Sequence, residues 1–149
     1  MQTILILNGP NLNMLGQREP EIYGHETLED IQKLCEDKAS DLGVRVHFRQ
    51  SNHEGELVTW IQQAAQTPGP YAGLIINAAA YTHTSIAIHD ALKLLNIPII
   101  EVHISDPETR EDFRHTSFIT PVAAAVYKGL GANGYAKSLE HISNLIHTQ

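Results

Sequence analysis

The sequence predicts an α/β protein, a three-layer sandwich in which helices cover both faces of one parallel sheet. Short apolar runs alternate along the chain with longer segments whose apolar residues recur every three or four positions. The runs are nearly continuous, as in Leu-Ile-Ile at residues 74–76, which is typical of strands that helices bury on both faces. With 149 residues, the chain is expected to form a single domain over residues 1–149.

The elements follow from these patterns in order along the chain. Five strands are expected, over residues 3–7, 44–48, 73–76, 97–102 and 122–127. Four long helices are expected, over residues 27–42, 54–66, 84–95 and 134–146. Thr27 precedes two acidic residues as a capping residue would, and Gly43 comes where the first long helix should end. Ligands of such sheets bind beyond the carboxyl ends of the strands, so the connections after the first, third and fourth strands should face the site.

The overall charge narrows the class of partner. Lys and Arg number 10 against 17 Asp and Glu, a formal net charge of −7, which argues against nucleic acid or an anionic membrane as the main partner. The single cysteine, Cys35, excludes an internal disulfide and fits a reducing compartment; it is expected to be buried and unreactive. The first residues lack the charge and apolar core of a signal peptide, so a cytoplasmic location is expected. No convincing ligand spacing is found among the histidines, so no metal is expected.

A long segment with neither strand nor helix pattern, residues 8–24, follows the first strand. Connections of this length inside a small domain are usually lids or binding loops. Apolar side chains within it, such as Leu12 and Leu15, favour packing over disorder. The segment also carries Arg18 and Tyr23 five positions apart, an arrangement that suits a tyrosinate acting as a base.

Glu101 and His103 end the fourth expected strand and, being two positions apart, point to the same side. A carboxylate in contact with an imidazole can fix its tautomer and raise its basicity, which suits a general acid. A purely structural hydrogen bond at a strand end is the alternative. The amides of Ile104 and Ser105, where the strand breaks, could bind a carboxylate.

Small residues follow the third strand, where Asn77 precedes three alanines and a helix is expected to begin at Thr82 or Thr84. Such residues let a ligand approach the backbone, and a helix amino terminus suits an anion. His83 there is either a ligand contact or a capping or surface histidine. Asp90 would share its helix face but lie roughly 10 Å along the axis. If both line a site, Asp90 is expected to reach a neighbouring subunit's pocket.

Two further motifs each allow two interpretations. Arg110 and Arg114, four positions apart, would share a face if their segment were helical, and Arg114 could fork onto vicinal hydroxyls or a carboxylate. Surface ion pairs are the other interpretation. Gly129, Gly131 and Gly134 match a dinucleotide fingerprint, but they follow the last expected strand rather than open an early βαβ unit. They are better interpreted as a tight turn and close helix packing.

Together these motifs resemble the type II 3-dehydroquinate dehydratases over essentially the whole chain. The resemblance rests on residues 8–24, Gln-Ser-Asn-His-Glu-Gly-Glu-Leu at 50–57, Thr-His-Thr-Ser at 82–85, Glu-Val-His-Ile-Ser at 101–105, and Arg114. Family members often have proline after the residue that matches Asn77. Here Ala78, Ala79 and Ala80 follow, which keeps the side chains small.

The resemblance implies a flavodoxin-like fold with strand order 2-1-3-4-5 and a dodecamer built from trimers. It implies a single catalytic domain that converts 3-dehydroquinate to 3-dehydroshikimate with loss of water, using no metal or organic cofactor. That reaction is the third step of the shikimate pathway to chorismate and the aromatic amino acids. The same chemistry serves quinate breakdown, so both roles stay open.

Residue roles carry over by position. Tyr23 resembles the base that removes a proton next to the ketone, and His103 the acid that protonates the departing hydroxyl. Arg18 is implied to stabilise the tyrosinate and Asn11 to hold the enolate through water. Glu101, from its pairing with His103, is expected to orient the acid. The implied substrate contacts are Asn77, His83, Ile104, Ser105 and Arg114, with Asp90 from an adjacent subunit.

An anionic tyrosine at neutral pH demands a special environment. A free tyrosine titrates near pH 10, so the pKa of Tyr23 must fall by about three units, or roughly 4 kcal/mol. One arginine in water would fall short. Closing the loop over the substrate would lower the local dielectric and bring Arg18, with Arg114, close enough. Residues 17–25 or so are therefore expected to form a mobile lid.

A non-catalytic small-anion or flavin binding module on the same fold is the alternative, because this architecture hosts many functions. A flavin carrier would place a hydroxyl-rich phosphate loop directly after the first strand. This chain has Asn-Gly-Pro-Asn at residues 8–11 instead. The converging polar residues are also more than a binding module needs.

Overall fold

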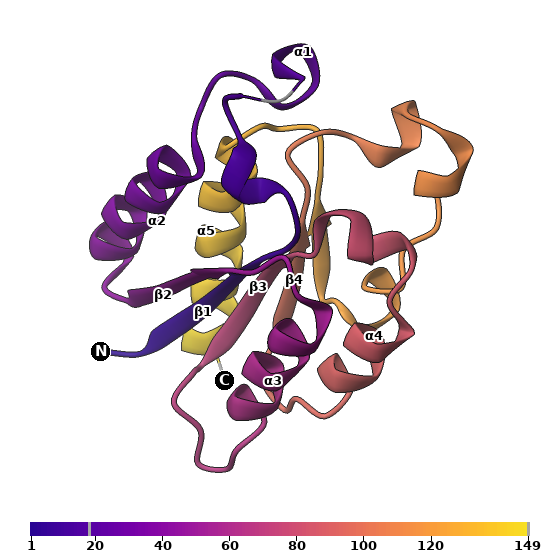
Figure 1. The fold of residues 1–149 in the computed structure, drawn as a ribbon. Coiled ribbons are helices and arrows are strands. Elements are labelled where there is room, and N and C mark those ends of the chain that lie inside the picture. The colour runs from indigo at the N-terminus through magenta and orange to yellow at the C-terminus, as the bar shows by residue number, and fades with distance from the viewer. Residues whose placement is uncertain (18, 149) are drawn as a thin grey trace.

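The computed structural model describes residues 1–17 and 19–148 and contains one parallel sheet between two layers of helices (Figure 1). The strands run in the order β2-β1-β3-β4-β5, as expected. Their bounds are β1 Thr3–Asn8, β2 Arg45–Gln50, β3 Gly73–Asn77, β4 Ile99–Val102 and β5 Ala125–Tyr127. All four neighbouring pairs are parallel, so the carboxyl ends of the strands meet at one edge of the sheet.

Each face of the sheet has its own helices and its own core. The helices α2 (Leu28–Leu42) and α5 (Asn133–His147) cover one face, and α3 (Glu54–Ala64) and α4 (Ile86–Leu92) cover the other. The interior strand β1 serves both cores, because Ile4 and Ile6 belong to the first and Leu5 and Leu7 to the second. This double burial explains why its sequence is apolar throughout.

The helix ends follow from local chemistry. Thr27 caps α2 through a reciprocal pair: its Oγ1 accepts from the Asp30 amide at 3.2 Å, while the Asp30 carboxylate accepts from the Thr27 amide at 3.0 Å. Gly43 ends the helix with a φ of 74°, a conformation that favours glycine. Gly129 and Gly131 have φ values of 75° and 61°, which confirms the tight turn expected before α5. No helix in the described part of the chain has both the length and the apolar character needed to cross a membrane.

Two expectations about local structure were wrong. The connection at residues 8–24 is not irregular throughout, since it contains a 3₁₀ turn, Leu12–Met14, and the short helix α1 (Pro20–Tyr23). Leu12 and Leu15 bury themselves against the first core and hold that turn in place. The helix expected from Thr82 or Thr84 begins instead at Ile86, because Ser85 is its cap and accepts from the Ile88 amide at 2.9 Å.

Candidate active site

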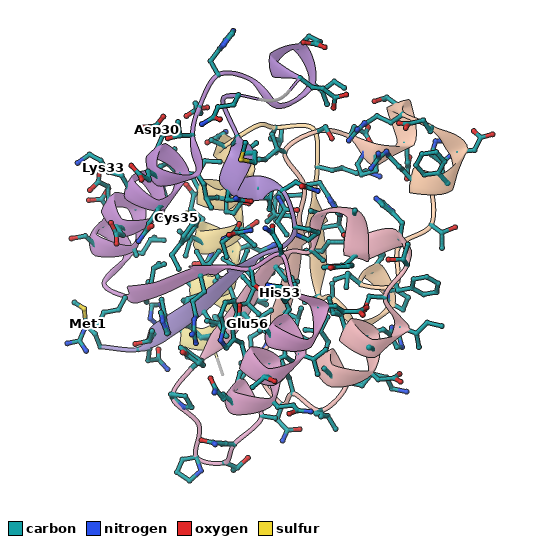
Figure 2. All side chains as sticks on the ribbon, viewed as in Figure 1. Met1, Asp30, Lys33, Cys35, His53 and Glu56 are labelled. Atoms are coloured by element: carbon teal, nitrogen blue, oxygen red, sulfur yellow. The ribbon has the colours of Figure 1, made fainter. Side chains whose placement is uncertain are left out.

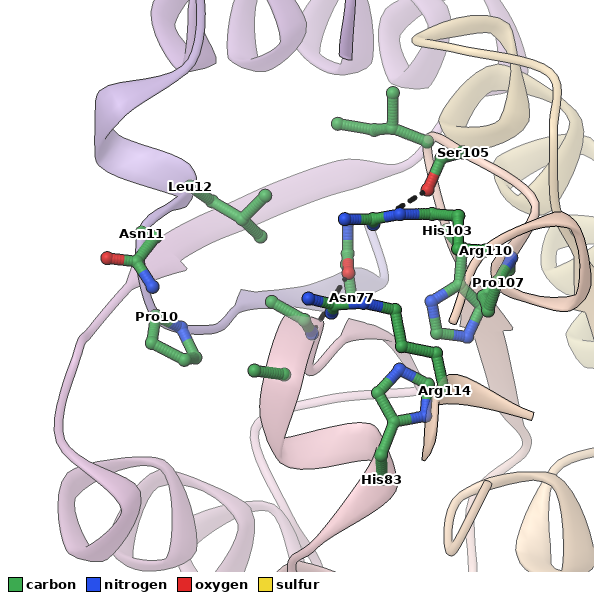
Figure 3. Close-up of a pocket in the computed structure, with 13 residues that line it drawn as sticks. Pro10, Asn11, Leu12, Asn77, His83, His103, Ser105, Pro107, Arg110 and Arg114 are labelled. Carbon is green, nitrogen blue, oxygen red and sulfur yellow. Dashed lines mark hydrogen bonds between the residues drawn. The ribbon is translucent and has the colours of Figure 1, made fainter. Parts of the chain in front are cut away.

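A cavity of about 180 Å³ lies at the edge where β1, β3 and β4 end (Figure 3). Three connections supply its walls, as the topology of the sheet predicts. The lining residues are Pro10, Asn11 and Leu12 after β1; Asn77, Ala79, Ala80 and His83 at the end of β3 and after it; and His103, Ile104, Ser105, Pro107, Arg110 and Arg114 after β4. The cavity therefore brings together side chains that are far apart in the sequence.

The wall after β1 is fixed by its neighbours. The Gly9 amide donates to the Asn77 carbonyl at 2.8 Å, which ties the start of the wall to the end of β3. The Asn11 amide donates to Asn52 Oδ1 at 3.0 Å. Gln50 joins the two contacts, because its Nε2 donates to the Gly9 carbonyl and to Asn52 Oδ1, each at 3.1 Å. Asn11 thus belongs to a rigid part of the connection.

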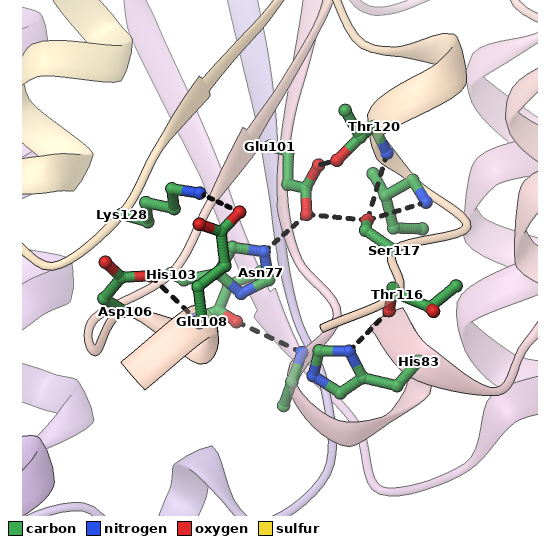
Figure 4. A network of polar contacts seen from close by, with 12 residues as sticks. Asn77, His83, Glu101, His103, Asp106, Glu108, Thr116, Ser117, Thr120 and Lys128 are labelled. Carbon is green, nitrogen blue, oxygen red and sulfur yellow. Dashed lines mark hydrogen bonds and ion pairs between the residues drawn. The ribbon is translucent and has the colours of Figure 1, made fainter. Parts of the chain in front are cut away.

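The acidic partner of His103 is buried beside it (Figure 4). Glu101 and His103 are only 1% and 6% exposed, and His103 Nε2 lies 2.5 Å from Glu101 Oε2. Burial alone would raise the pKa of Glu101, but hydrogen bonds from His103, Thr120 and Ser117 hold it below its ordinary value. A carboxylate only accepts hydrogen bonds, so the Nε2 that faces it carries a proton and the other ring nitrogen is left for the cavity.

His83 stands next to this pair as a second imidazole. Its ring lies 6.5 Å from the His103 ring, centroid to centroid, and its Nδ1 donates to the Thr116 carbonyl at 2.8 Å. Burial lowers the pKa of His83, and the positive charges of His103 and Arg114 lower it further, against the opposing effect of the Thr116 carbonyl. His83 is therefore neutral near pH 7, with Nε2 left as an acceptor.

The remaining wall favours an anion. Arg110 and Arg114 both line the cavity, and Arg110 Nη1 donates to Ser105 Oγ at 3.4 Å. The amides of Ile104 and Ser105 donate no hydrogen bond to any described residue. Two guanidinium groups and two such amides on one side of a cavity can hold a carboxylate.

Asn77 is oriented from beneath the cavity by a buried tyrosine of α5. Tyr135 is fully buried and burial raises its pKa, so its hydroxyl keeps its proton and donates to Asn8 Oδ1 at 2.7 Å. The same hydroxyl accepts from Asn77 Nδ2 at 3.0 Å. Asn77 Oδ1 accepts in turn from the Ala79 amide at 3.1 Å, which leaves one amide hydrogen of Asn77 for a ligand.

Comparison with known proteins identifies the family. A family model described as "Dehydroquinase class II" matches residues 2–143. The chain belongs to this family. Among its relatives, "3-dehydroquinate dehydratase 2" of Ralstonia nicotianae is 54% identical over 93% of this chain and 92% of its own length. "3-dehydroquinate dehydratase" of Bartonella henselae is 58% identical, also over 93% of this chain and 92% of its own length.

Solved dehydroquinases agree with the fold. The crystal structure of the type II dehydroquinase from Propionibacterium acnes superposes with a TM-score of 0.91 at 42% identity, covering 97% of each chain. The resemblance drawn from the motifs and the flavodoxin-like α/β fold are therefore confirmed. Membership of a family of hydro-lyases makes this dehydroquinase an enzyme, which leaves the non-catalytic binding module without support.

The structure corrects the expected relation between His83 and Asp90. They do not share a helix face, because His83 ends the 3₁₀ turn Ala79–His83 and α4 starts only after Ser85. Asp90 is exposed on α4 and does not line the cavity of its own subunit. A contact with a neighbouring subunit's cavity stays a prediction for Asp90.

The two residues expected on the lid, Arg18 and Tyr23, fall wholly or partly outside the described residues. Arg18 lies outside the described residues, and so does the side chain of Tyr23, although its backbone ends α1. Between α1 and the connection after β4 runs a groove of about 590 Å³, lined by Ile22 on one side and by Ser105 and Arg110 on the other. This helix therefore stands over the rim of the cavity.

Sequence reasoning assigned no role to several residues that build this site. Arg110 and Arg114 would share a face only if their segment formed one helix, and it does not. An extended Arg110 separates the turns Pro107–Thr109 and Asp112–Arg114, yet both side chains reach the cavity. The alternative interpretation, surface ion pairs, is confirmed in part, since Arg114 Nε lies 3.0 Å from Glu111 Oε1. Tyr135 was missed because no local pattern marks a buried hydroxyl in the last helix.

Cys35 takes no part in this site. It lies on the side of α2 that faces the sheet (Figure 2) and is fully buried, as expected. Burial, together with the nearby charge of Glu36, raises the pKa of its thiol to about 12, so it is inert as a nucleophile. Within residues 1–17 and 19–148, no three His, Cys, Asp or Glu side chains are arranged to hold a metal ion.

Proposed function

We propose that this dehydroquinase removes water from 3-dehydroquinate to give 3-dehydroshikimate in the cavity beyond β1, β3 and β4. The observation that carries the proposal is the buried Glu101–His103 pair, whose imidazole opens into a cavity that two arginines also line, together with two amides that donate to no described residue. An acid poised beside an anion-binding wall suits a substrate with one carboxylate and several hydroxyls. Relatives named 3-dehydroquinate dehydratase support the same substrate.

Elimination needs a base and an acid on the substrate at once. We assign the base to Tyr23 in its anionic form, which takes a proton from the carbon next to the ketone and leaves an enolate. Asn11 holds the enolate oxygen through water. His103 then gives its proton to the departing hydroxyl, so the carbon–oxygen bond breaks, water leaves and the conjugated ketone forms. Glu101 orients the imidazole and stays ionised throughout.

The lid supplies the environment that the base requires. The helix α1 ends at Tyr23 and faces Ser105 and Arg110 across a groove, so its closure over the rim would bring the phenol toward the cavity. We assign to Arg18 the stabilisation of the phenolate, with Arg114 contributing once the substrate excludes water. Residues 17–25 or so act as the moving part, while Asn11 stays fixed.

The substrate contacts divide by chemistry. We assign the carboxylate to the Ile104 and Ser105 amides, and the ring hydroxyls to Asn77, His83 and Arg114. In this arrangement the neutral His83 accepts a hydrogen bond from a hydroxyl through Nε2.

The proposed role of Asp90 depends on the assembly of subunits. We assign the exposed Asp90 of α4 to the cavity of a neighbouring subunit, within trimers that form a dodecamer. Dilution to monomers should then lower turnover, and Asp90→Asn should do so at high protein concentration without dissociating the assembly. Monomers with full activity would remove this role. We place the reaction in a reducing, cytoplasmic compartment and in the third step of the shikimate pathway, with quinate breakdown as the other use of the same chemistry.

The test of the proposal is turnover with 3-dehydroquinate, followed by the ultraviolet absorbance of the conjugated product. The wild type should convert the substrate, and Tyr23→Phe should abolish turnover while substrate binding largely survives. Tyr71→Phe is the matched control, because that phenol contacts His47 and lies outside the cavity. Turnover by Tyr23→Phe above a few per cent of wild type would place the base elsewhere.

A further inference from the structure

Glu101 is held from the side opposite His103 by two hydroxyl groups (Figure 4). Ser117 Oγ donates to Glu101 Oε2 at 2.9 Å, and Thr120 Oγ1 donates to Glu101 Oε1 at 2.6 Å. With the imidazole at 2.5 Å, the buried carboxylate receives three donors over its two oxygens. Both hydroxyls come from the segment between Arg114 and β5, which is far from Glu101 in the sequence.

The Ser117 hydroxyl has no freedom to point elsewhere. Its oxygen accepts from the amides of Ile119 and Thr120, each at 3.1 Å. Both lone pairs are then in use, so the single hydroxyl hydrogen is directed at Glu101. The same contacts fix the turn that begins at Thr120 and place its hydroxyl against the other carboxylate oxygen. The donors are therefore oriented before any substrate binds.

These three hydrogen bonds favour the ionised form of Glu101. A buried carboxyl would otherwise take up a proton, and a protonated Glu101 would donate to the imidazole instead of accepting from it. The ring would then carry its single proton on the cavity-facing nitrogen as a neutral imidazole, which is a far weaker acid than the imidazolium that an ionised Glu101 stabilises. Three charge-assisted hydrogen bonds oppose that outcome.

We propose that Ser117 and Thr120 are positioning residues for His103: they keep Glu101 ionised and fix its plane, so that the imidazole presents its other nitrogen to the substrate. The inference rests on the proposed role of His103 as the acid. It adds two residues that touch neither the substrate nor the reacting atoms.

Thr120 offers the cleaner test, because Ser117 also holds the turn. Thr120→Val removes the hydroxyl and keeps the shape of the side chain, while Thr120→Ser keeps the hydroxyl. Thr59→Val on α3 is the matched control, since its hydroxyl donates only to the Gly55 carbonyl of its own helix. All three variants are chosen to retain the fold.

The expected pH effect has a definite sign. Removing a donor destabilises the carboxylate, so the pKa of Glu101 rises and the acidic limb of the pH profile moves to higher pH. A shift of about one unit is expected, since a hydrogen bond to a charged group contributes at least that much. The other charged or titratable groups around this carboxylate are His103, His83, Glu108, Arg114, His115 and Lys128.

The experiment combines a titration with kinetics. Carboxyl carbon NMR, with the Glu101 signal assigned through Glu101→Gln, should show the midpoint of Glu101 rising by about one unit in Thr120→Val. The kcat for 3-dehydroquinate should fall about tenfold with KM within about twofold, and Thr120→Ser should restore both the midpoint and kcat.

The outcomes separate the two proposals. A wild type without turnover would overturn the proposed function itself. An active wild type with Thr120→Val unchanged in either midpoint or kcat, or with Thr120→Ser as impaired as Thr120→Val, would overturn only the role of the hydroxyls. An equal loss in Thr59→Val would show that the kinetic change is unspecific and would count against the proposal as well.

Discussion

Replacing Gly9 by alanine should open the cavity at the point where two of its walls meet. The Gly9 amide donates to the Asn77 carbonyl at 2.8 Å, so the connection after β1 passes directly against the end of β3. A Cβ atom at Gly9 would lie 2.3 Å from the Ala78 carbonyl oxygen and 2.7 Å from its carbon. Both atoms belong to the backbone, so no side chain can move aside.

The size of the effect follows from these distances. A carbon and a carbonyl oxygen approach to about 3.3 Å even in favourable contacts, so the walls must separate by about 1 Å. Overpacking of this kind costs about 3 kcal/mol, at the upper end of its usual range because backbone must shift. Asn11 and Asn77 would move apart by a similar distance. Misplacement of about 1 Å can lower the rate about a hundredfold.

The assay pairs urea denaturation with turnover of 3-dehydroquinate. Gly9→Ala should lower the free energy of unfolding by about 3 kcal/mol and kcat/KM by about a hundredfold. Gly55→Ala is the control with the opposite sign: nothing lies within 4 Å of its added Cβ, and alanine in α3 should stabilise the fold by about 0.5 to 1 kcal/mol. Gly9→Ala with the stability and activity of the wild type would refute the close approach.

Three further results are expected. His103→Ala should lower kcat by about 10²- to 10⁴-fold, the usual contribution of a general acid, and Glu101→Gln by less, because the carboxylate only orients; equal losses in steady-state kinetics would contradict this order. Tyr135→Phe should lower the free energy of unfolding by about 2 kcal/mol, since it leaves the buried Asn8 Oδ1 without its donor, and an unchanged urea midpoint would argue against that contact. Ala79 has a φ of 53°, so Ala79→Gly should raise the free energy of unfolding by about 1 kcal/mol. A lower Tm in thermal unfolding would contradict this expectation.

The sequence predicted the fold well because burial and periodicity leave direct marks. The alternation of Ile4 and Ile6 with Leu5 and Leu7 between two cores produces a continuous apolar run that only a doubly covered strand explains. The cap at Thr27 was predictable for a similar reason, since its partner Asp30 is three positions away. Such local rules fix element type and, given parallel strands, the edge where a ligand binds.

Errors arose where a short-range choice was decided by one hydrogen bond. Thr82, Thr84 and Ser85 are all acceptable caps by type, and the structure uses Ser85, so His83 falls outside α4. The consequence was the wrong expectation that His83 and Asp90 share a helix face. Nothing in the spacing of these residues distinguishes the three choices.

The part of the site that sequence reasoning missed depends on contacts between distant segments. Ser117 and Thr120 reach Glu101 from 16 and 19 positions away, and Tyr135 reaches Asn8 across 127 positions. Glu101 and His103, in contrast, were expected to touch because a strand places alternate residues on one side. Hydroxyl groups in turns and in the last helix carry no signal of their partners until the chain is folded.

The decisive measurement is whether the cavity converts 3-dehydroquinate or merely binds it. Binding of 3-dehydroquinate should be measured by calorimetry on Tyr23→Phe. The wild type should be mixed with the same substrate, and its product followed by ultraviolet absorbance and mass. We expect the variant to bind the substrate, and the wild-type product to have lost one water and to absorb as a conjugated ketone. Binding by both proteins with the substrate recovered intact would contradict it.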